Sequence, residues 1–121
     1  MFLFRPGKDR VTVDEAVRRT QGADAPAVLL NAREQGEWAA GHAPGAGHAP
    51  LSRLQGGAPL PDAAQDRPAV VICRSGHRSR RAAELPTGRG VDAVGVKGGM
   101  QAWAAAGHSV VDARGNNGSI A

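Results

Sequence analysis

The chain of 121 residues is poor in several residue types, and each shortage excludes a class of protein. A single cysteine excludes an internal disulfide framework and a zinc site built from several cysteines. No apolar run approaches the ~20 residues that a membrane-spanning helix needs. The apolar start of the chain is too short for the core of a signal peptide. We therefore expect a cytoplasmic protein that makes no contact with a membrane.

Aromatic residues are also scarce, because the chain has no tyrosine, two phenylalanines and two tryptophans. The hydrophobic share of 41% and the charged share of 21% are nevertheless those of a soluble globular protein, so the core must be built largely from small aliphatic side chains. The length fits one compact domain, and the 17 glycines and eight prolines indicate many turns.

The formal net charge of +4 raises the question of an anionic partner. Most arginines are scattered, and no basic stripe alternates with aromatic residues, so nucleic acid is not the expected partner. One local concentration stands out, at Arg74, Arg78, Arg80 and Arg81, and it follows the only cysteine. This pattern favours a small anion.

Short apolar strands alternate with short helices along the chain. Strands are expected at 27–32, 69–73 and 91–96, and helices within 11–19 (capped by Thr12 or Asp14) and at 34–40, 51–54, 79–85 and 100–106. Such an order predicts an α/β fold with a central, mostly parallel sheet and helices on both faces. We expect an N-terminal extension at 1–10, the domain at 11–111, a loop at 42–50, and a flexible, frayed C-terminal tail at 112–121.

Cys73 ends the clearest predicted strand and precedes a turn that leads into a helix. Backbone N–H groups of the turn, the helix dipole, and the charges of Arg74 and Arg78 would all favour a thiolate there over a thiol. Gly76 would let the backbone approach a ligand closely. The bland alternative is a buried structural thiol, which a cysteine at a strand end often is. Two guanidinium groups in one short loop favour the nucleophile, because apolar burial does not recruit them.

The spacing in this loop is informative. Four residues separate Cys73 from Arg78. The phosphate-binding loop of protein tyrosine phosphatases is similar but has five, and the narrower loop suits a smaller reacting atom, such as one sulfane sulfur. The sequence CRSGHRS at 73–79 resembles the active-site loop of single-domain rhodanese-like sulfurtransferases. AREQGEWAAGHAPGA at 32–46 and KGGMQAWAAAG at 97–107 resemble two further motifs of that family, in the expected order.

The resemblance implies a rhodanese-like fold and a ping-pong transfer of sulfur. Cys73 would attack a donor such as thiosulfate and hold the sulfur as a persulfide, which cyanide, a thiol or a protein acceptor would remove. The loop residues that would bind the anionic donor are Arg74, Ser75, Gly76, His77, Arg78 and Ser79. No metal or organic cofactor is implied. Asn31 departs from the family pattern, which usually has an aspartate there, so a non-catalytic docking or sulfur-delivery module remains an alternative. A phosphatase or arsenate reductase on the same fold is a third possibility.

Several other residues have structural interpretations. Trp38 and Trp103 are expected in or at the edge of the core. His42 is expected to brace the Pro44–Gly45 turn by a hydrogen bond. Arg33 and Glu37 are four residues apart, which predicts an ion pair on a short helix, although Glu37 could instead line the mouth of the pocket.

Overall fold

The computed structural model describes residues 10–22, 25–60, 67–74 and 93–120. It contains a five-stranded sheet in the order β1-β5-β4-β2-β3, and every pairing between neighbouring strands is parallel. The strands are β1 (Arg10–Val11), β2 (Val28–Asn31), β3 (Gly47–His48), β4 (Ala69–Ile72) and β5 (Ala93–Val96). The expected parallel sheet is therefore confirmed.

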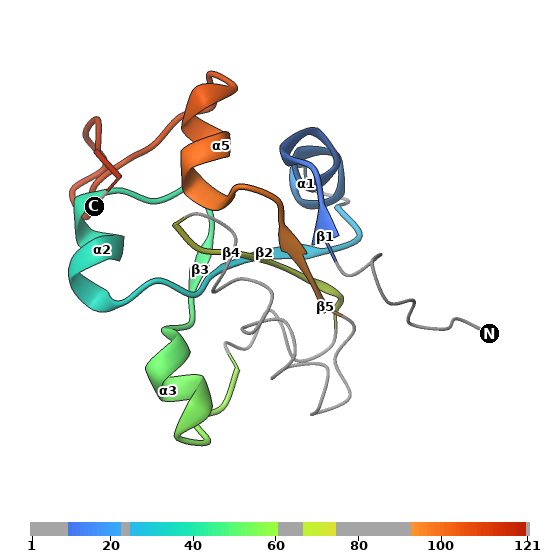
Figure 1. Cartoon of the computed structure of the whole chain (residues 1–121), viewed down its shortest axis with the longest axis vertical. Coiled ribbons are helices and arrows are strands. Elements are labelled where there is room, and N and C mark those ends of the chain that lie inside the picture. The colour runs from blue at the N-terminus through green and yellow to red at the C-terminus, as the bar shows by residue number, and fades with distance from the viewer. Residues whose placement is uncertain (1–9, 23–24, 61–66, 75–92, 121) are drawn as a thin grey trace.

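Helices cover both faces of this sheet (Figure 1). Helices α1 (Val13–Thr20) and α5 (Gly99–Ala105) pack on one face, and α3 (Leu51–Gln55) packs on the other. Each face has its own core: one contains Val70, Ile72 and Trp103, and the other contains Val71, Leu51 and Leu54. Because β4 is buried on both faces, all four of its residues are apolar, which made it the clearest strand in the sequence.

Local capping explains where two of the helices begin. Thr12 is the N-cap of α1, and its hydroxyl accepts a hydrogen bond from the backbone N–H of Glu15 at 3.2 Å. Helix α2 (Gln35–Ala40) begins after Glu34, and Glu34 and Glu37 form a reciprocal capping box. Arg33 therefore lies before α2, whereas the sequence had suggested a position within the helix. The predicted helix at 79–85 lies outside the described residues.

Residues 42–50, expected to be a loop, contain strand β3. Gly47 pairs with Leu30 and His48 pairs with Asn31 at the end of β2. Parallel pairing uses backbone groups, so a glycine and a histidine can form a short edge strand that carries no hydrophobic pattern. No helix in the described part of the chain is long and apolar enough to cross a membrane.

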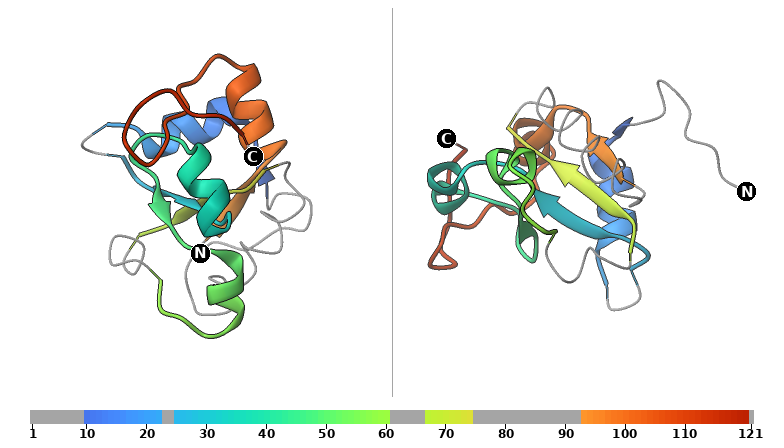
Figure 2. Two further views of the ribbon diagram at one scale, coloured as in Figure 1. Left: turned by 90° about the vertical axis from the view of Figure 1, so that its left-hand side faces the viewer. Right: turned by 90° about the horizontal axis from the view of Figure 1, so that it is seen from below.

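The C-terminal segment, expected to be frayed, is hydrogen-bonded to the domain. We call residues 108–120 the C-terminal clasp. Within it, Val111 forms antiparallel bridges to His42 and to Asn117. The N–H groups of Ala113 and Ser119 donate to the carbonyl groups of Ala39 and Ala40, at 3.1 and 2.9 Å. These carbonyl groups end α2 and lack partners within the helix, so the clasp caps α2. Both views in Figure 2 show the C-terminal segment beside α2.

Candidate active site

Cys73 directly follows the central strand β4, at the edge of the sheet where parallel strands end. It is a free cysteine, and its exposed fraction is 0%. Ligands of open parallel sheets bind at this carboxyl edge, where strands lead into loops and helices. The position at the strand end agrees with the sequence-based expectation, but the complete burial of the thiol was not anticipated.

The backbone at Cys73 is held by the first turn of α5. The N–H of Met100 donates to the carbonyl of Cys73 at 2.6 Å, and the N–H of Gln101 donates to the carbonyl of Arg74 at 3.0 Å. A helix has free N–H groups in its first turn, and here they bind the two carbonyl groups that begin the loop. The start of the loop is therefore fixed by a different part of the chain.

Gly99 makes this contact possible. Its φ of 55° lies in the left-handed region, and a Cβ there would be 2.3 Å from the carbonyl oxygen of Cys73 and 2.8 Å from that of Arg74. Any side chain would force α5 away from the loop. The preceding Gly98 has a φ of 75°. The sequence showed this glycine pair only as a turn before a helix, and its contact with Cys73 was missed.

The end of β2 lies beside Cys73. Asn31 is opposite Ile72 in the sheet, and the N–H of Ala32 donates to the carbonyl of Ile72 at 2.9 Å. The side-chain oxygen of Asn31 accepts a hydrogen bond from the N–H of Arg33 at 2.9 Å. Both Asn31 and Arg33 have an exposed fraction of 0%. The edge therefore carries a buried amide and a buried guanidinium close to the cysteine.

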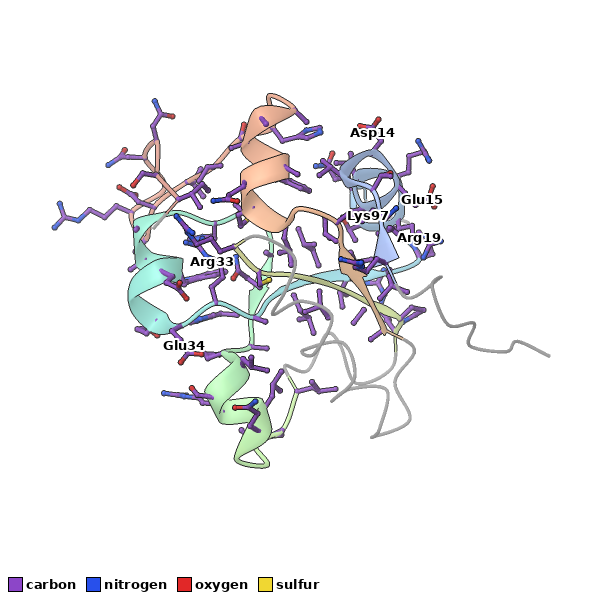
Figure 3. The ribbon with its side chains drawn as sticks, in the orientation of Figure 1. Asp14, Glu15, Arg19, Arg33, Glu34 and Lys97 are labelled. Carbon is purple, nitrogen blue, oxygen red and sulfur yellow. The ribbon has the colours of Figure 1, made fainter. Side chains whose placement is uncertain are left out.

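The guanidinium of Arg33 is anchored toward α2. Its Nη1 donates to the carbonyl of Gly41, directly after the helix. Nε2 of His48 lies 2.8 Å from the carbonyl of Arg33, which fits a donated hydrogen bond. Figure 3 shows Arg33 between β2 and α2 and Glu34 beside α3. Sequence analysis had considered Arg33 only as a partner of Glu37.

Trp38 is stacked between two histidine rings. The ring centroids are 3.5 Å apart for Trp38 and His42, and 4.6 Å apart for Trp38 and His48. Nδ1 of His42 lies 2.8 Å from the carbonyl of Trp38, so His42 caps α2 and does not bond to the turn at Pro44, as we had expected. Trp103 is buried in the core, as expected, and its indole N–H donates to the carbonyl of Ser109.

The acidic residues that follow β2 are engaged in local structure. Oε1 of Glu37 accepts a hydrogen bond from the N–H of Glu34 at 2.9 Å. The carboxylate of Glu34 accepts hydrogen bonds from the hydroxyl of Ser52 at 2.6 Å and from its N–H at 3.2 Å. These bonds hold α2 and α3 in place, and they direct the Glu34 carboxylate toward α3.

The structure describes only part of the predicted anion-binding loop. Cys73 and Arg74 are described, and the side chain of Arg74 is exposed. Ser75, Gly76, His77, Arg78 and Ser79 lie outside the described residues, so the predicted grouping of their side chains around Cys73 stays a prediction.

A hollow of about 580 Å³ lies elsewhere, between the end of α1, the start of β2 and residues 44–47. Neither Cys73 nor Arg74 lines it. It opens at the amino end of β2, whereas ligands of parallel sheets bind at the carboxyl end, so we do not identify it with the active site. No group of three or more side chains suited to hold a metal ion occurs among the described residues.

Comparisons with known proteins agree with this architecture. A rhodanese-related protein from Thermoplasma volcanium is 26% identical, with a TM-score of 0.68 over 84% of this chain and 96% of that protein. A rhodanese-like domain protein from Staphylococcus aureus is 28% identical, with a TM-score of 0.66 over 78% and 90%. A rhodanese homologue from Thermus thermophilus is 25% identical, with a TM-score of 0.61 over 77% and 98%. Residues 12–106 also match the family model for the rhodanese-like domain. The chain therefore belongs to the rhodanese-like domain family.

Proposed function

We propose that the protein is a cytoplasmic sulfurtransferase that carries a sulfane sulfur as a persulfide on Cys73. The observation that carries the proposal is the position of Cys73. The only cysteine of the chain ends the central strand, and its carbonyl is fixed by the first turn of α5. A backbone held from two directions keeps a nucleophile in one geometry, which favours reaction with a bound donor.

The reaction balances without a cofactor. The thiolate of Cys73 attacks the outer sulfur of thiosulfate, the sulfur–sulfur bond of the donor breaks, and sulfite leaves with the bonding electron pair. Cyanide then attacks the outer sulfur of the persulfide, thiocyanate leaves, and the thiolate returns. Arg74 and the remaining loop residues would bind the anionic donor and stabilise the persulfide.

The burial of Cys73 favours small donors. A thiol with an exposed fraction of 0% offers no surface to a bulky reagent. A single terminal sulfur atom is the smallest group that the donor could present to it. The burial also supports the second candidate function, a docking or sulfur-delivery module, in which the thiol serves a protein partner and turns over slowly with free acceptors.

Mass spectrometry of the intact chain distinguishes these functions. After treatment with thiosulfate, we expect one added sulfur, about 32 Da, and its removal by cyanide with formation of thiocyanate. Cys73→Ala is the matched control and should gain no sulfur. Alanine is preferred to serine because a serine hydroxyl would need a hydrogen-bond partner in this buried position. Absence of both the adduct and thiocyanate would refute the proposal. An adduct that persists in the presence of cyanide would favour the delivery module.

A phosphatase reaction is tested with the same pair of proteins. Hydrolysis of a small phosphate ester that is lost in Cys73→Ala would show that the cysteine serves phosphoryl transfer. We expect no difference between the two proteins in this assay.

A further inference from the structure

Asn31 has a side chain that local structure only half explains. It is the last residue of β2, and it pairs with Ile72 on one side and with His48 on the other. Its oxygen accepts the N–H of Arg33, but its Nδ2 is buried and has no hydrogen-bond partner among the described residues. Leaving a buried donor unpaired costs free energy, so stability alone does not account for an amide at this position.

The position of Asn31 gives its charge a direct influence on Cys73. Neighbouring strands are about 4.8 Å apart, and Asn31 lies opposite the residue that precedes Cys73. A side-chain charge at position 31 would therefore lie within about 10 Å of the thiol, in a region shielded from water, where charges interact strongly. Asparagine is neutral and adds no negative charge to this edge.

A dianionic donor makes this neutrality important. The attacking thiolate and a dianion carry three negative charges into one small space during the first step. A carboxylate at position 31 would add a fourth, and the barrier would rise most for the donor with the largest charge. The described carboxylates that follow β2, Glu34 and Glu37, are bound to other groups.

We propose that Asn31 determines the donor class of this site by keeping its carboxyl edge free of negative charge at that position, so that dianionic sulfane-sulfur donors are preferred. The preference among donors rests on the proposed function, whereas the influence of residue 31 on the charge near Cys73 does not. Asn31 acts here as a specificity-determining residue, through its charge.

The charge effect can be measured without any sulfur transfer. Iodoacetate and iodoacetamide alkylate thiols by the same reaction but differ by one negative charge, and the chain has a single cysteine, so mass spectrometry follows Cys73 directly. At low salt, we expect the ratio of the two rate constants, iodoacetate over iodoacetamide, to exceed that of N-acetylcysteinamide, a neutral free thiol. Added salt should lower the ratio. A wild-type ratio at or below that of the free thiol would overturn the proposal, and this outcome needs no variant.

Two variants separate charge from packing. Asn31→Asp keeps the shape and adds a charge, and it should lower the ratio about tenfold, as expected for charges roughly 8 Å apart in a partly shielded region. Asn31→Leu removes the hydrogen bond to Arg33 but adds no charge, and its ratio should stay within about twofold of the wild type. An unchanged ratio in Asn31→Asp, or an equal fall in both variants, would contradict the proposed role.

The donor preference is tested with thiosulfate and methanethiosulfonate. Both carry one terminal sulfane sulfur, but the first is a dianion and the second a monoanion. Asn31→Asp should lower kcat/KM for thiosulfate about tenfold more than for methanethiosulfonate. Equal losses for the two donors would refute the donor selectivity. If the wild type transfers sulfur from neither donor, the proposed function fails, whereas the alkylation ratio still decides the influence of Asn31 on Cys73.

Discussion

The contact between α2 and the C-terminal clasp can be tested with two substitutions in neighbouring glycines. Gly41 directly follows α2, and its φ of −179° is extended backbone that any residue adopts. A Cβ at Gly41 would nevertheless be 2.1 Å from the carbonyl oxygen of Ser119 and 2.8 Å from Cγ1 of Val110. Gly36, inside the helix, has nothing within 4 Å of the same position. Gly41→Ala should therefore displace the clasp, and Gly36→Ala should not.

The expected free-energy changes have opposite signs. Displacing the clasp by Gly41→Ala would break the hydrogen bonds that Ser119 and Ala113 donate to the end of α2. Each contributes about 1 kcal/mol, and the forced shift of packed backbone adds about 1–3 kcal/mol, so we expect a loss of roughly 3–4 kcal/mol in the free energy of unfolding. Gly36→Ala should raise that free energy by about 0.5 kcal/mol, because alanine is the better helix former.

Thermal and urea denaturation followed by circular dichroism measures this difference. For a chain of this length 1 kcal/mol corresponds to roughly 4 °C, so the Tm of Gly41→Ala should fall by roughly 12–15 °C while that of Gly36→Ala rises slightly. Amide hydrogen exchange in α2 should accelerate only in Gly41→Ala. The reasoning would be refuted if both variants had the wild-type Tm, or if Gly36→Ala were the more destabilising of the two.

Two further predictions concern α5 and α1. Gly99→Ala should cost more than 3 kcal/mol and lower the alkylation rate of Cys73, whereas Gly107→Ala, with a φ of 87° and open space around its Cβ position, should cost only about 1 kcal/mol; denaturation and iodoacetamide kinetics compare them, and equal effects would exclude the close approach as the cause. Hydrogen bonds from Arg19 and then Arg18 lower the pKa of Glu15. Its ionised form is therefore favoured by folding, and that small stabilisation is present above the ordinary glutamate pKa and lost as the pH falls through the lowered one. Glu15→Gln should reduce Tm slightly at pH 7 and not at pH 2, and a loss that is the same at both pH values would contradict the pairing.

The sequence predicted the elements whose cause is local. Four consecutive buried residues made β4 visible, because a strand that is covered on both faces must be apolar throughout. Thr12 was recognised as a helix cap because its hydroxyl bonds to an N–H only three residues away. Cys73 could be placed at a strand end for the same reason, since it directly follows β4.

The features that the sequence did not reveal depend on distant partners. Strand β3 and the clasp are held by backbone hydrogen bonds, which leave no hydrophobic pattern in the sequence. Gly41 and Gly99 are required because another segment passes close to them, and the identity of that segment is visible only in the fold. The burial of Cys73 and the stacking of Trp38 between two histidines likewise arise from residues that are far apart in sequence or brought together by turns.

These distant contacts converge on the carboxyl edge of the sheet. Cys73 is fixed by α5 through Met100, and Arg33, beyond the end of β2, is fixed through the carbonyl of Gly41. The clasp caps α2 directly before Gly41, so a residue outside the segment that matches the family model supports the position of Arg33. Backbone contacts of this kind constrain geometry without demanding particular side chains. The side chain at position 31 is therefore free to set the charge of the edge while the framework around Cys73 stays the same.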